Sequence, residues 1–250
     1  MTFIYKLLNG KNIIQDGGNN NKIPKHLEFI GTLWYIINNE KKYCCGCSYL
    51  GNGYVLTAAH CLINKEKDQV RVQFNSIRLD NCNAEYLIDN IKIYPFFNKR
   101  KHSNDIAILK LVGDPQITPI LLPMRRKFDN FYKIGNKVKV HGFGKIARDC
   151  DVSINLKEIY LSIVSQNKTK YPKKFIHPSM LFVSDTRDIS IDQKMDTFQG
   201  DSGNALIYSV GGKNYIIGIV SFGLKKLKPG YPGVYTKIGN FIHWIKKIVI

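Results

Sequence analysis

The sequence predicts an all-β protein. Short runs of strand-forming residues recur along the chain, turn-forming residues gather between them, and helical periodicity is clear only at the C-terminal end. Many short strands joined by frequent turns favour a barrel or a sandwich over a layered α/β fold. With 250 residues, the chain can bury the core of one large domain or of two small ones.

The strand signal is strongest in four segments. Residues 70–74 and 137–141 alternate apolar and polar side chains, and residues 106–111 and 215–220 are mainly apolar. Gly, Asn, Asp and Pro cluster between such runs and predict turns at residues 51–53, 80–83, 113–115, 211–214 and 229–233.

The C-terminal residues predict a helix. In residues 240–250 the side chains of Phe241, Ile245, Ile248 and Val249 fall on one helical face, and Lys246 and Lys247 fall elsewhere. One apolar stripe of this kind is the pattern of a helix that packs on a core.

The charge of the chain is strongly positive. There are 37 Lys and Arg residues against 19 Asp and Glu, a net charge of +18. Such a field attracts anionic partners, including nucleic acids, sulfated glycans and membrane surfaces. No zinc-finger, RNP or basic-helix pattern supports nucleic-acid readout. No stretch approaches the roughly 20 apolar residues of a membrane span, and Lys6 interrupts the N-terminal apolar residues, so no signal-peptide core is expected.

Six cysteines are too few for a disulfide-held miniprotein. The Cys-Cys-Gly-Cys run at residues 44–47 does not fit an ordinary zinc pattern. We therefore expect no metal site.

Three segments carry chemistry. They are Leu-Thr-Ala-Ala-His-Cys at residues 56–61, Asn-Asp-Ile-Ala-Ile-Leu at residues 104–109 and Gly-Asp-Ser-Gly at residues 200–203. Each segment alone has an ordinary structural interpretation as a strand end or a turn. Together, and in the order His, Asp, Ser, they resemble the chymotrypsin/trypsin family of serine endopeptidases (family S1), in which this order is characteristic.

The resemblance assigns catalytic roles to three residues. A serine hydroxyl needs a base to remove its proton, and histidine suits that role because its ordinary pKa is about 6.5. By resemblance, Ser202 is the nucleophile, His60 the general base and then acid, and Asp105 the carboxylate that orients His60. The backbone N–H groups of Gly200 and Ser202 would form the oxyanion hole.

The resemblance also predicts substrate specificity. Asp196 stands six residues before Ser202, where trypsin-like members carry the carboxylate at the base of the primary specificity pocket. The segment Ser221, Phe222 and Gly223 matches the strand that pairs with the substrate backbone, and Gly233 lies in the matching Pro-Gly-Val-Tyr turn. A buried carboxylate in an open slot selects Arg or Lys, so we expect cleavage after these residues.

The family fold sets the expected architecture. It implies two Greek-key six-stranded barrels, packed perpendicular to each other, followed by a C-terminal helix. The resemblance covers nearly all of the chain after residue 13. We expect a short propeptide at 1–12 and a peptidase domain at 13–250, with barrels at about 24–115 and 120–238 and the helix at about 240–250.

One disulfide follows from the resemblance, which pairs Cys45 with Cys61 beside the catalytic histidine. The other family bridges are missing. Their positions are occupied by Phe198 with Lys226, by Val138 with Tyr208, and by Phe182. Free thiols at the remaining cysteines would fit a reducing compartment; these are Cys44, Cys47, Cys82 and Cys150. Gly203 is followed by Asn204 and Ala205 rather than the family's Gly-Pro, which affects the fine geometry after the nucleophile.

Activation in the family depends on a new N-terminus, whose ammonium group pairs with the aspartate before the nucleophile, here Asp201. The sequence leaves Ile13 and Ile14 as alternatives for this residue, and cleavage after Lys11 would instead expose Asn12.

The resemblance implies a secreted, extracellular zymogen without a cofactor, a monomer that acts on proteins or peptides with Arg or Lys before the scissile bond. Two rival classes stay open. The chain could be a non-catalytic protease homologue that binds a partner, although no triad residue is lost. It could instead bind nucleic acid or glycan, for which a basic exosite on a protease is the more plausible form.

Overall fold

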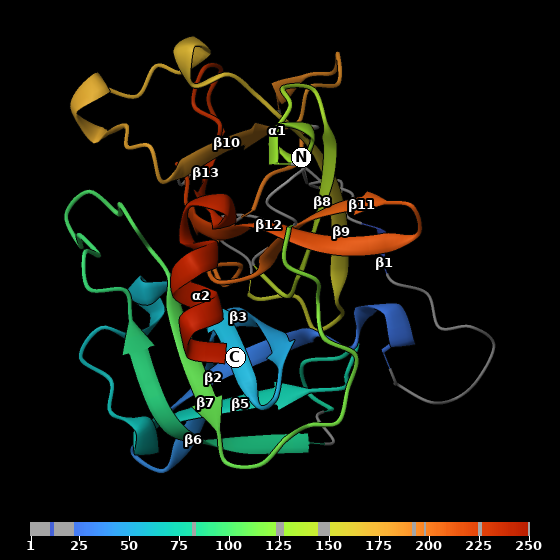
Figure 1. Cartoon of the computed structure of the whole chain (residues 1–250). Coiled ribbons are helices and arrows are strands. Elements are labelled where there is room, and N and C mark those ends of the chain that lie inside the picture. The colour runs from blue at the N-terminus through green and yellow to red at the C-terminus, as the bar shows by residue number, and fades with distance from the viewer. Residues whose placement is uncertain are drawn as a thin grey trace.

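The computed structural model describes residues 11–12, 23–81, 84–123, 128–144, 151–191, 194–197, 199–224 and 227–249. Two β-barrels dominate it (Figure 1). The first is a closed antiparallel barrel in the order β2-β3-β4-β7-β6-β5. Its strands are β2 (Ile30–Ile37), β3 (Glu40–Gly51), β4 (Tyr54–Thr57), β5 (Val70–Phe74), β6 (Ala84–Ile93) and β7 (Ala107–Leu111).

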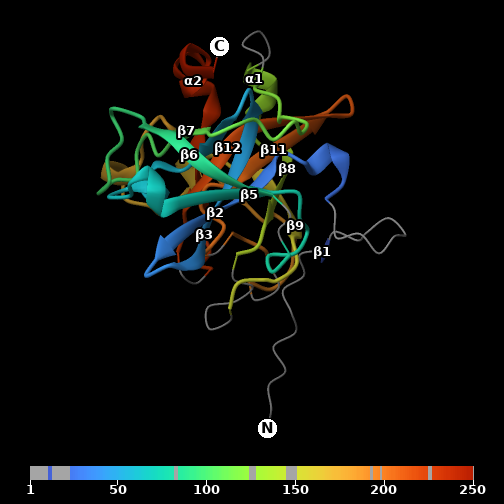
Figure 2. The same cartoon turned by 90° about the horizontal axis from the view of Figure 1, so that it is seen from below.

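The second barrel also closes. The sheet runs β9-β10-β13-β12-β11-β8, and β8 pairs with β9 to complete the ring. Its strands are β8 (Lys137–Gly142), β9 (Lys157–Ile163), β10 (Met180–Ser184), β11 (Ala205–Val210), β12 (Lys213–Phe222) and β13 (Gly233–Lys237). The short strand β1 (Lys11–Asn12) adds to the outside of β9, away from the C-terminal helix (Figure 2). Two closed six-stranded barrels confirm the predicted fold class.

The two α-helices are short. They are α1 (Phe128–Phe131) and α2 (Ile242–Val249), and a 3₁₀ turn at Ile238–Phe241 leads into α2. The apolar side of α2 faces the first barrel: the Tyr94 ring meets the rings of Phe241 and Trp244 with centroids 4.9 and 5.2 Å apart. Although α2 follows the second barrel in the chain, it therefore ties the two barrels together. In the described part of the chain no helix is long and apolar enough to cross a membrane.

Side-chain alternation explains how the strands build their cores. In β5, Val70, Val72 and Phe74 are buried in the first barrel, and Arg71 between them is half-buried. Fully extended strands place successive side chains on opposite faces, so the sequence pattern selects which face enters the barrel. The β11–β12 hairpin turns through Gly211 and Gly212, both with positive φ, as its tight connection requires.

Apolar packing fills positions of the missing family bridges. Val138 is buried on β8, and the β8–β11 register continues to place it opposite Tyr208. Phe131 stacks edge-on against Tyr208, with ring centroids 5.8 Å apart. Phe182 is buried beside Tyr171, with centroids 6.4 Å apart. The second barrel thus holds these positions with side-chain contacts.

Candidate active site

His60 and Asp105 meet at the edge of the first barrel. β4 ends at Thr57, and the 3₁₀ turn Ala59–Leu62 presents His60, whereas Asp105 lies just before β7. His60 Nδ1 lies 2.7 Å from Asp105 Oδ2, and the backbone N–H of His60 donates to Asp105 Oδ1 at 2.8 Å. Both carboxylate oxygens therefore hold His60, which leaves Nε2 as the outward nitrogen of the ring.

The second barrel completes the surroundings of Asp105. The side chain is fully buried, the Ser221 hydroxyl donates to Oδ2, and the Thr236 hydroxyl donates to the backbone oxygen at 2.8 Å. Burial alone would raise the pKa of Asp105. The facing imidazoles of His102 and His60 and the hydroxyl of Ser221 outweigh it and hold this pKa well below its usual range. Asp105 is therefore a carboxylate at every pH at which His60 can act as a base.

His102 is a neighbour that sequence reasoning missed. Its ring lies edge-on to His60, with centroids 5.5 Å apart, and against Phe222 at 5.3 Å. Its Nδ1 is buried 3.8 Å from Asp105 Oδ2 and has no hydrogen-bond partner within the described residues. The only signal in the sequence was its place three residues before Asp105.

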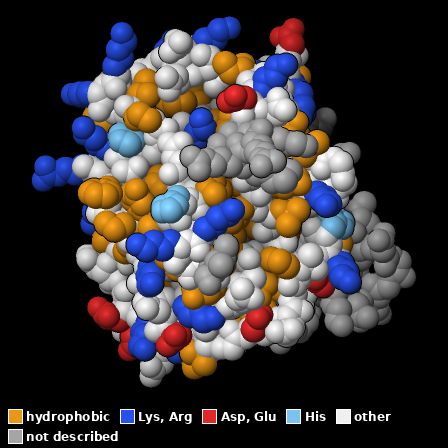
Figure 3. Space-filling model, viewed as in Figure 1, with side chains coloured by type: hydrophobic (Ala, Val, Ile, Leu, Met, Phe, Trp, Pro, Cys, Tyr) orange, Lys and Arg blue, Asp and Glu red, His pale blue; other side chains and the backbone are white. Residues whose placement is uncertain are grey.

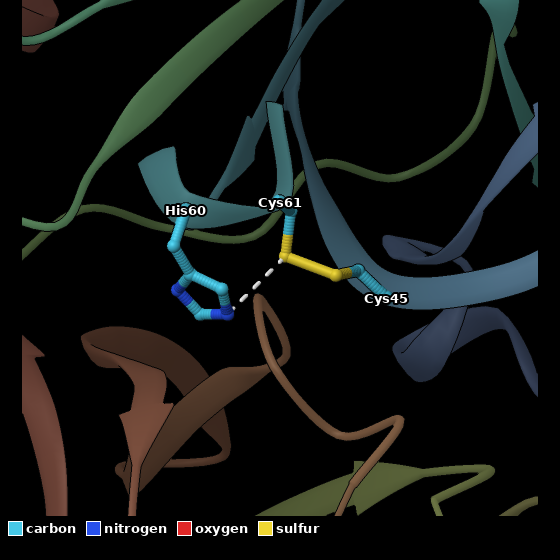
Figure 4. Close-up of side chains that lie close together, drawn as sticks. All are labelled: Cys45, His60 and Cys61. Atoms are coloured by element: carbon cyan, nitrogen blue, oxygen red, sulfur yellow. Dashed lines mark hydrogen bonds between the residues drawn. A yellow bond between two sulfur atoms is a disulfide. The ribbon is translucent and has the colours of Figure 1, made fainter. Parts of the chain in front are cut away.

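The predicted disulfide is confirmed: Cys45 and Cys61 are bonded. Figure 4 shows the bridge beside the outward edge of the His60 ring, whose Nε2 lies 3.8 Å from Cys61 Sγ. Gly46, which follows Cys45 in the chain, contacts the segment of Ser202: the N–H of Gly46 donates to the Ser202 carbonyl at 2.7 Å. One strand of the first barrel thus positions both the His60 turn and the Ser202 backbone.

Ser202 and Gly200 lie at a tight turn before β11. Gly200 has φ +98°, a conformation that favours glycine, and the Tyr43 hydroxyl donates to its carbonyl at 2.6 Å. Within the described residues the N–H groups of Gly200 and Ser202 have no acceptor, and no hydrogen bond joins His60 to Ser202. Catalytic hydrogen bonds in substrate-free enzymes are often long and tighten when substrate binds.

Asn204, the departure from the family pattern, fits because two glycines make room for it. A Cβ added at Gly46 would lie 1.7 Å from Asn204 Oδ1, and one added at Gly142 would lie 2.4 Å from Asn204 Nδ2. Asn204 is buried, and its Nδ2 donates to Asp201 Oδ1 at 3.5 Å. The segment after Ser202 is therefore packed on the first barrel rather than loosened by this substitution.

Asp196 lies beside Gly233, and Gly223 lies next to Gly233. A Cβ added at Gly233 would sit 2.8 Å from Asp196 Oδ1, and one added at Gly223 would lie 4.0 Å from the Cα of Gly233. The N–H of Thr197 donates to Asp196 Oδ1 at 2.8 Å. Burial, helped by the negative charges of Asp201 and Asp185, outweighs this bond and raises the pKa of Asp196 to about 7.

Asp185 anchors the segment that carries Asp196, a role that no motif indicated. Its buried carboxylate accepts bonds from the Arg187 guanidinium and, at 2.9 Å, from the N–H of Met195. Burial alone would raise the pKa of Asp185, but these donors lower it to about 2. A permanently charged Asp185 therefore fixes the backbone next to Asp196.

The remaining predicted residues are placed as follows. Ser221 and Phe222 end β12, where the pairing with β13 shifts register, and Phe222 is half-buried. Asp201 Oδ1 accepts the N–H of Gly144 at 2.9 Å. Ile13 and Ile14, the alternatives for its partner, lie outside the described residues, as do Phe198, Lys226, Cys82 and Cys150.

Cys44 and Cys47 are free thiols. Burial raises the pKa of Cys44 to about 12 and that of Cys47 well above its usual value. Both are therefore poor nucleophiles at neutral pH.

Two groups place possible metal-ligand atoms within 4.8 Å of one another. One comprises Cys45, His60 and Cys61, but both of its sulfurs are committed to the disulfide. The other comprises His60, His102 and Asp105, in which His60 and Asp105 already bind each other. Neither group offers a ready set of ligands for a metal.

Comparisons with known proteins agree with the geometry. The sequence profile of the family described as Trypsin matches residues 21–245. The chain is 32% identical to Chymotrypsin-2 of Vespa crabro over 82% of this chain and 89% of that protein. It is 31% identical to a venom protease of Bombus pensylvanicus over 79% of this chain and 82% of that protein. It is 27% identical to the Clotting factor G beta subunit of Tachypleus tridentatus over 84% of this chain and 72% of that protein. The chain belongs to the trypsin family of serine proteases.

Proposed function

We propose that this protein is a serine endopeptidase that works through an acyl-enzyme with His60, Asp105 and Ser202. The observation that carries the proposal is the pair of hydrogen bonds between Asp105 and His60, one at Nδ1 and one at the backbone N–H. This contact fixes the tautomer that leaves Nε2 free to accept a proton, as the family mechanism requires.

The reaction follows in two halves. Ser202 Oγ attacks the carbonyl carbon of the substrate while His60 Nε2 takes its proton, and Asp105 stabilises the imidazolium that forms. The N–H groups of Gly200 and Ser202 bind the oxyanion. His60 then protonates the departing amine, which leaves an ester on Ser202. Water attacks that ester by the same steps in reverse, and Ser202 regains its proton.

Substrate choice is proposed to rest on Asp196. A Cβ at Gly233 would lie 2.8 Å from Asp196 Oδ1, so a side chain there would crowd the carboxylate. A Cβ at Gly223 would come no closer than 4.0 Å to the Cα of Gly233, and we expect these two glycines to keep the approach to Asp196 open to a long side chain. No positive group within the described residues pairs with this half-buried carboxylate, and a bound guanidinium or ammonium would lower its pKa from about 7. We therefore expect cleavage after Arg and Lys.

Activation is proposed to pair a new N-terminal ammonium with Asp201. In the uncleaved chain, Lys11 and Asn12 pair with β9. Cleavage before Ile13 or Ile14 would detach Lys11 and Asn12 from the catalytic domain. Cleavage after Lys11 would instead expose Asn12. N-terminal sequencing of the active form distinguishes these sites.

The test of the function compares the activated wild type with Ser202→Ala and Asp196→Ser. The first change should lower hydrolysis of an Arg ester by several orders of magnitude with the fold intact by circular dichroism. The second should lower the preference for Arg over Phe substrates about 10²–10⁴-fold. An activated, folded wild type that neither hydrolyses the ester nor reacts with a fluorophosphonate would instead identify a non-catalytic homologue.

A further inference from the structure

The surface around Phe222 is unusually rich in positive charge. Residues 94–104, 164–184 and 221–237 together contain eleven Lys or Arg residues and no Asp or Glu. In two of these segments the cations are exposed, and we call the side chains of Lys99, Arg100, Lys101, Lys170, Lys173 and Lys174 the basic rim. The positive charge of this region is not offset by carboxylates of its own segments.

The fold places the two halves of the basic rim on either side of Phe222. His102, next to Lys101, packs on the Phe222 ring, with centroids 5.3 Å apart. Tyr171, next to Lys170, packs on the same ring at 6.0 Å. Phe222 therefore lies between the two segments that carry the basic rim.

Both segments are fixed to the body of the protein. The N–H of Asn104 donates to Ser179 Oγ at 2.9 Å, which joins one segment to the other. The N–H of Lys170 donates to the Gly230 carbonyl at 2.7 Å, and the Lys170 stem lies over Gly230. The backbone of both segments is consequently anchored, so the basic rim is not carried on free loops.

Within the described residues no cation of the basic rim forms an ion pair, whereas Lys41, Arg78 and Arg187 elsewhere do. Figure 3 shows blue side chains along the left and upper left of the molecule, where these segments lie, while red side chains gather elsewhere on that face. Like charges set close together raise the local potential, which an anionic ligand would relieve.

We propose that the basic rim binds acidic side chains of the substrate on the N-terminal side of the scissile bond. The substrates would then be proteins with a cluster of Asp or Glu just before the cleaved Arg or Lys. This inference rests on the proposed function, in which Ser221, Phe222 and Gly223 pair with that part of the substrate backbone. A chain lying along β12 at Phe222 passes between the two halves of the rim, so its side chains at neighbouring positions face cations on both sides.

The geometry favours a peptide over a free polyanion. The cations flank the residue that would contact substrate, so the chain held in the cleft itself delivers the carboxylates. A glycan would not be covalently joined to the peptide bound at the catalytic site, so it would not need cations at this position.

The test compares two peptides that share an Arg before the scissile bond. One carries Asp at the second to fifth positions before the bond, and the other carries Asn there. At low salt we expect kcat/KM to be about tenfold higher for the Asp peptide, because several exposed ion pairs each contribute a small amount. The advantage should fall to about twofold in 0.5 M NaCl, since salt screens exposed charges.

Charge reversal locates the effect. In Lys173→Glu/Lys174→Glu the ratio of kcat/KM for the two peptides should fall several-fold, and adding Lys99→Glu/Lys101→Glu should invert it. The matched control is Lys25→Glu/Lys213→Glu, with the same change in net charge at exposed sites that adjoin each other through the Asn214–His26 contact. The control should keep the wild-type ratio.

The outcomes are distinguishable. If the activated wild type cleaves neither peptide, the proposed peptidase function fails. If it cleaves both equally, the function stands and this inference is overturned. If it cleaves both equally while the reversed variants lose affinity for heparin, the basic rim serves a free polyanion and the inference is likewise overturned.

Discussion

Asp105 and Asp196 are both enclosed carboxylates near the catalytic centre, yet their environments act in opposite directions. Asp105 receives donors from His60 and Ser221 and has a pKa well below the usual range. Asp196 receives one backbone N–H from Thr197, faces other carboxylates, and has a pKa of about 7. Burial alone therefore does not set the charge of either group, because the number of donors decides.

At neutral pH, Asp105 is therefore ionised, whereas the ionisation of Asp196 depends on pH and on a bound cation. Asp105 is already charged throughout the pH range in which Asp196 titrates, so its contact with His60 needs no ligand. The ionised form of Asp196 destabilises the folded protein unless a cation is bound beside it. The contact between Asp105 and His60 is thus already formed in the folded protein, whereas the charge of Asp196, the proposed specificity residue, would be balanced only by a bound cation.

Asp105→Asn gives the largest expected effect. An amide cannot stabilise the imidazolium and favours the wrong tautomer, and in family enzymes this change lowers kcat about 10⁴-fold. Turnover of an Arg ester measures it, with thermal unfolding to show that the fold persists. A loss of less than tenfold would contradict the role of Asp105.

Asp196→Asn tests whether the charge of Asp196 lowers the free energy of unfolding. Because the pKa is raised from 3.8 to about 7 in the folded state, the wild type loses stability as pH rises from about 4 to 7, and the penalty is constant above that. The variant lacks the penalty, so at pH 8 it should be more stable by up to about 4 kcal/mol, with little difference at pH 4.

Urea unfolding at both pH values, in a Ser202→Ala background that prevents self-digestion, measures this difference. Asp188→Asn, at an exposed position, is the control and should change little at either pH. Equal stability of Asp196→Asn and its parent at pH 8 would show that the carboxylate carries no such cost.

The double variant Cys45→Ser/Cys61→Ser measures how much the disulfide stabilises the first barrel, for comparison with the second barrel, which relies on side-chain packing. The bridge closes a loop of sequence separation 16 in the first barrel, so its loss should lower the free energy of unfolding by about 3 kcal/mol. Cys44→Ser, next to the bridge, controls for serine in this strand. An unchanged urea midpoint in the double variant would mean that packing alone holds the His60 turn.

The smallest effect is expected for Val138→Cys/Tyr208→Cys. The β8–β11 register places these positions opposite each other, so a bridge should form. Its benefit of about 4 kcal/mol would be offset by the loss of Val138 and Tyr208 packing, which leaves a net change within about 1 kcal/mol. Thiol titration checks bridge formation, and a large net gain would show that the aromatic packing contributes little.

The sequence predicted the all-β fold and the Cys45–Cys61 disulfide, which the structure confirms. The strand at 70–74 matches β5, and the segments 137–141 and 215–220 fall within β8 and β12. These succeed because strand alternation is a local property and because the catalytic motifs are contiguous in the chain.

Other features could not be read from the chain because they join distant segments. Asn204 fits only because Gly46 and Gly142 approach it from two other strands. Asp185 acts by reaching the backbone of Met195, and His102 by packing on Phe222. Each depends on a close approach that no local pattern encodes. The roles of the triad, the specificity residues and Asp201 stay predictions until they are tested.

Asp105 is covalently part of the first barrel, but the hydroxyls that bind it at Ser221 and Thr236 come from the second. Any loosening of the interface between the barrels would remove these donors before either barrel melts. Enzymatic activity is therefore a sensitive reporter of interdomain cooperativity. On heating or in mild denaturant, turnover should decline ahead of the loss of β-structure, and an agent that wedges the barrels apart would inhibit without occupying the substrate cleft.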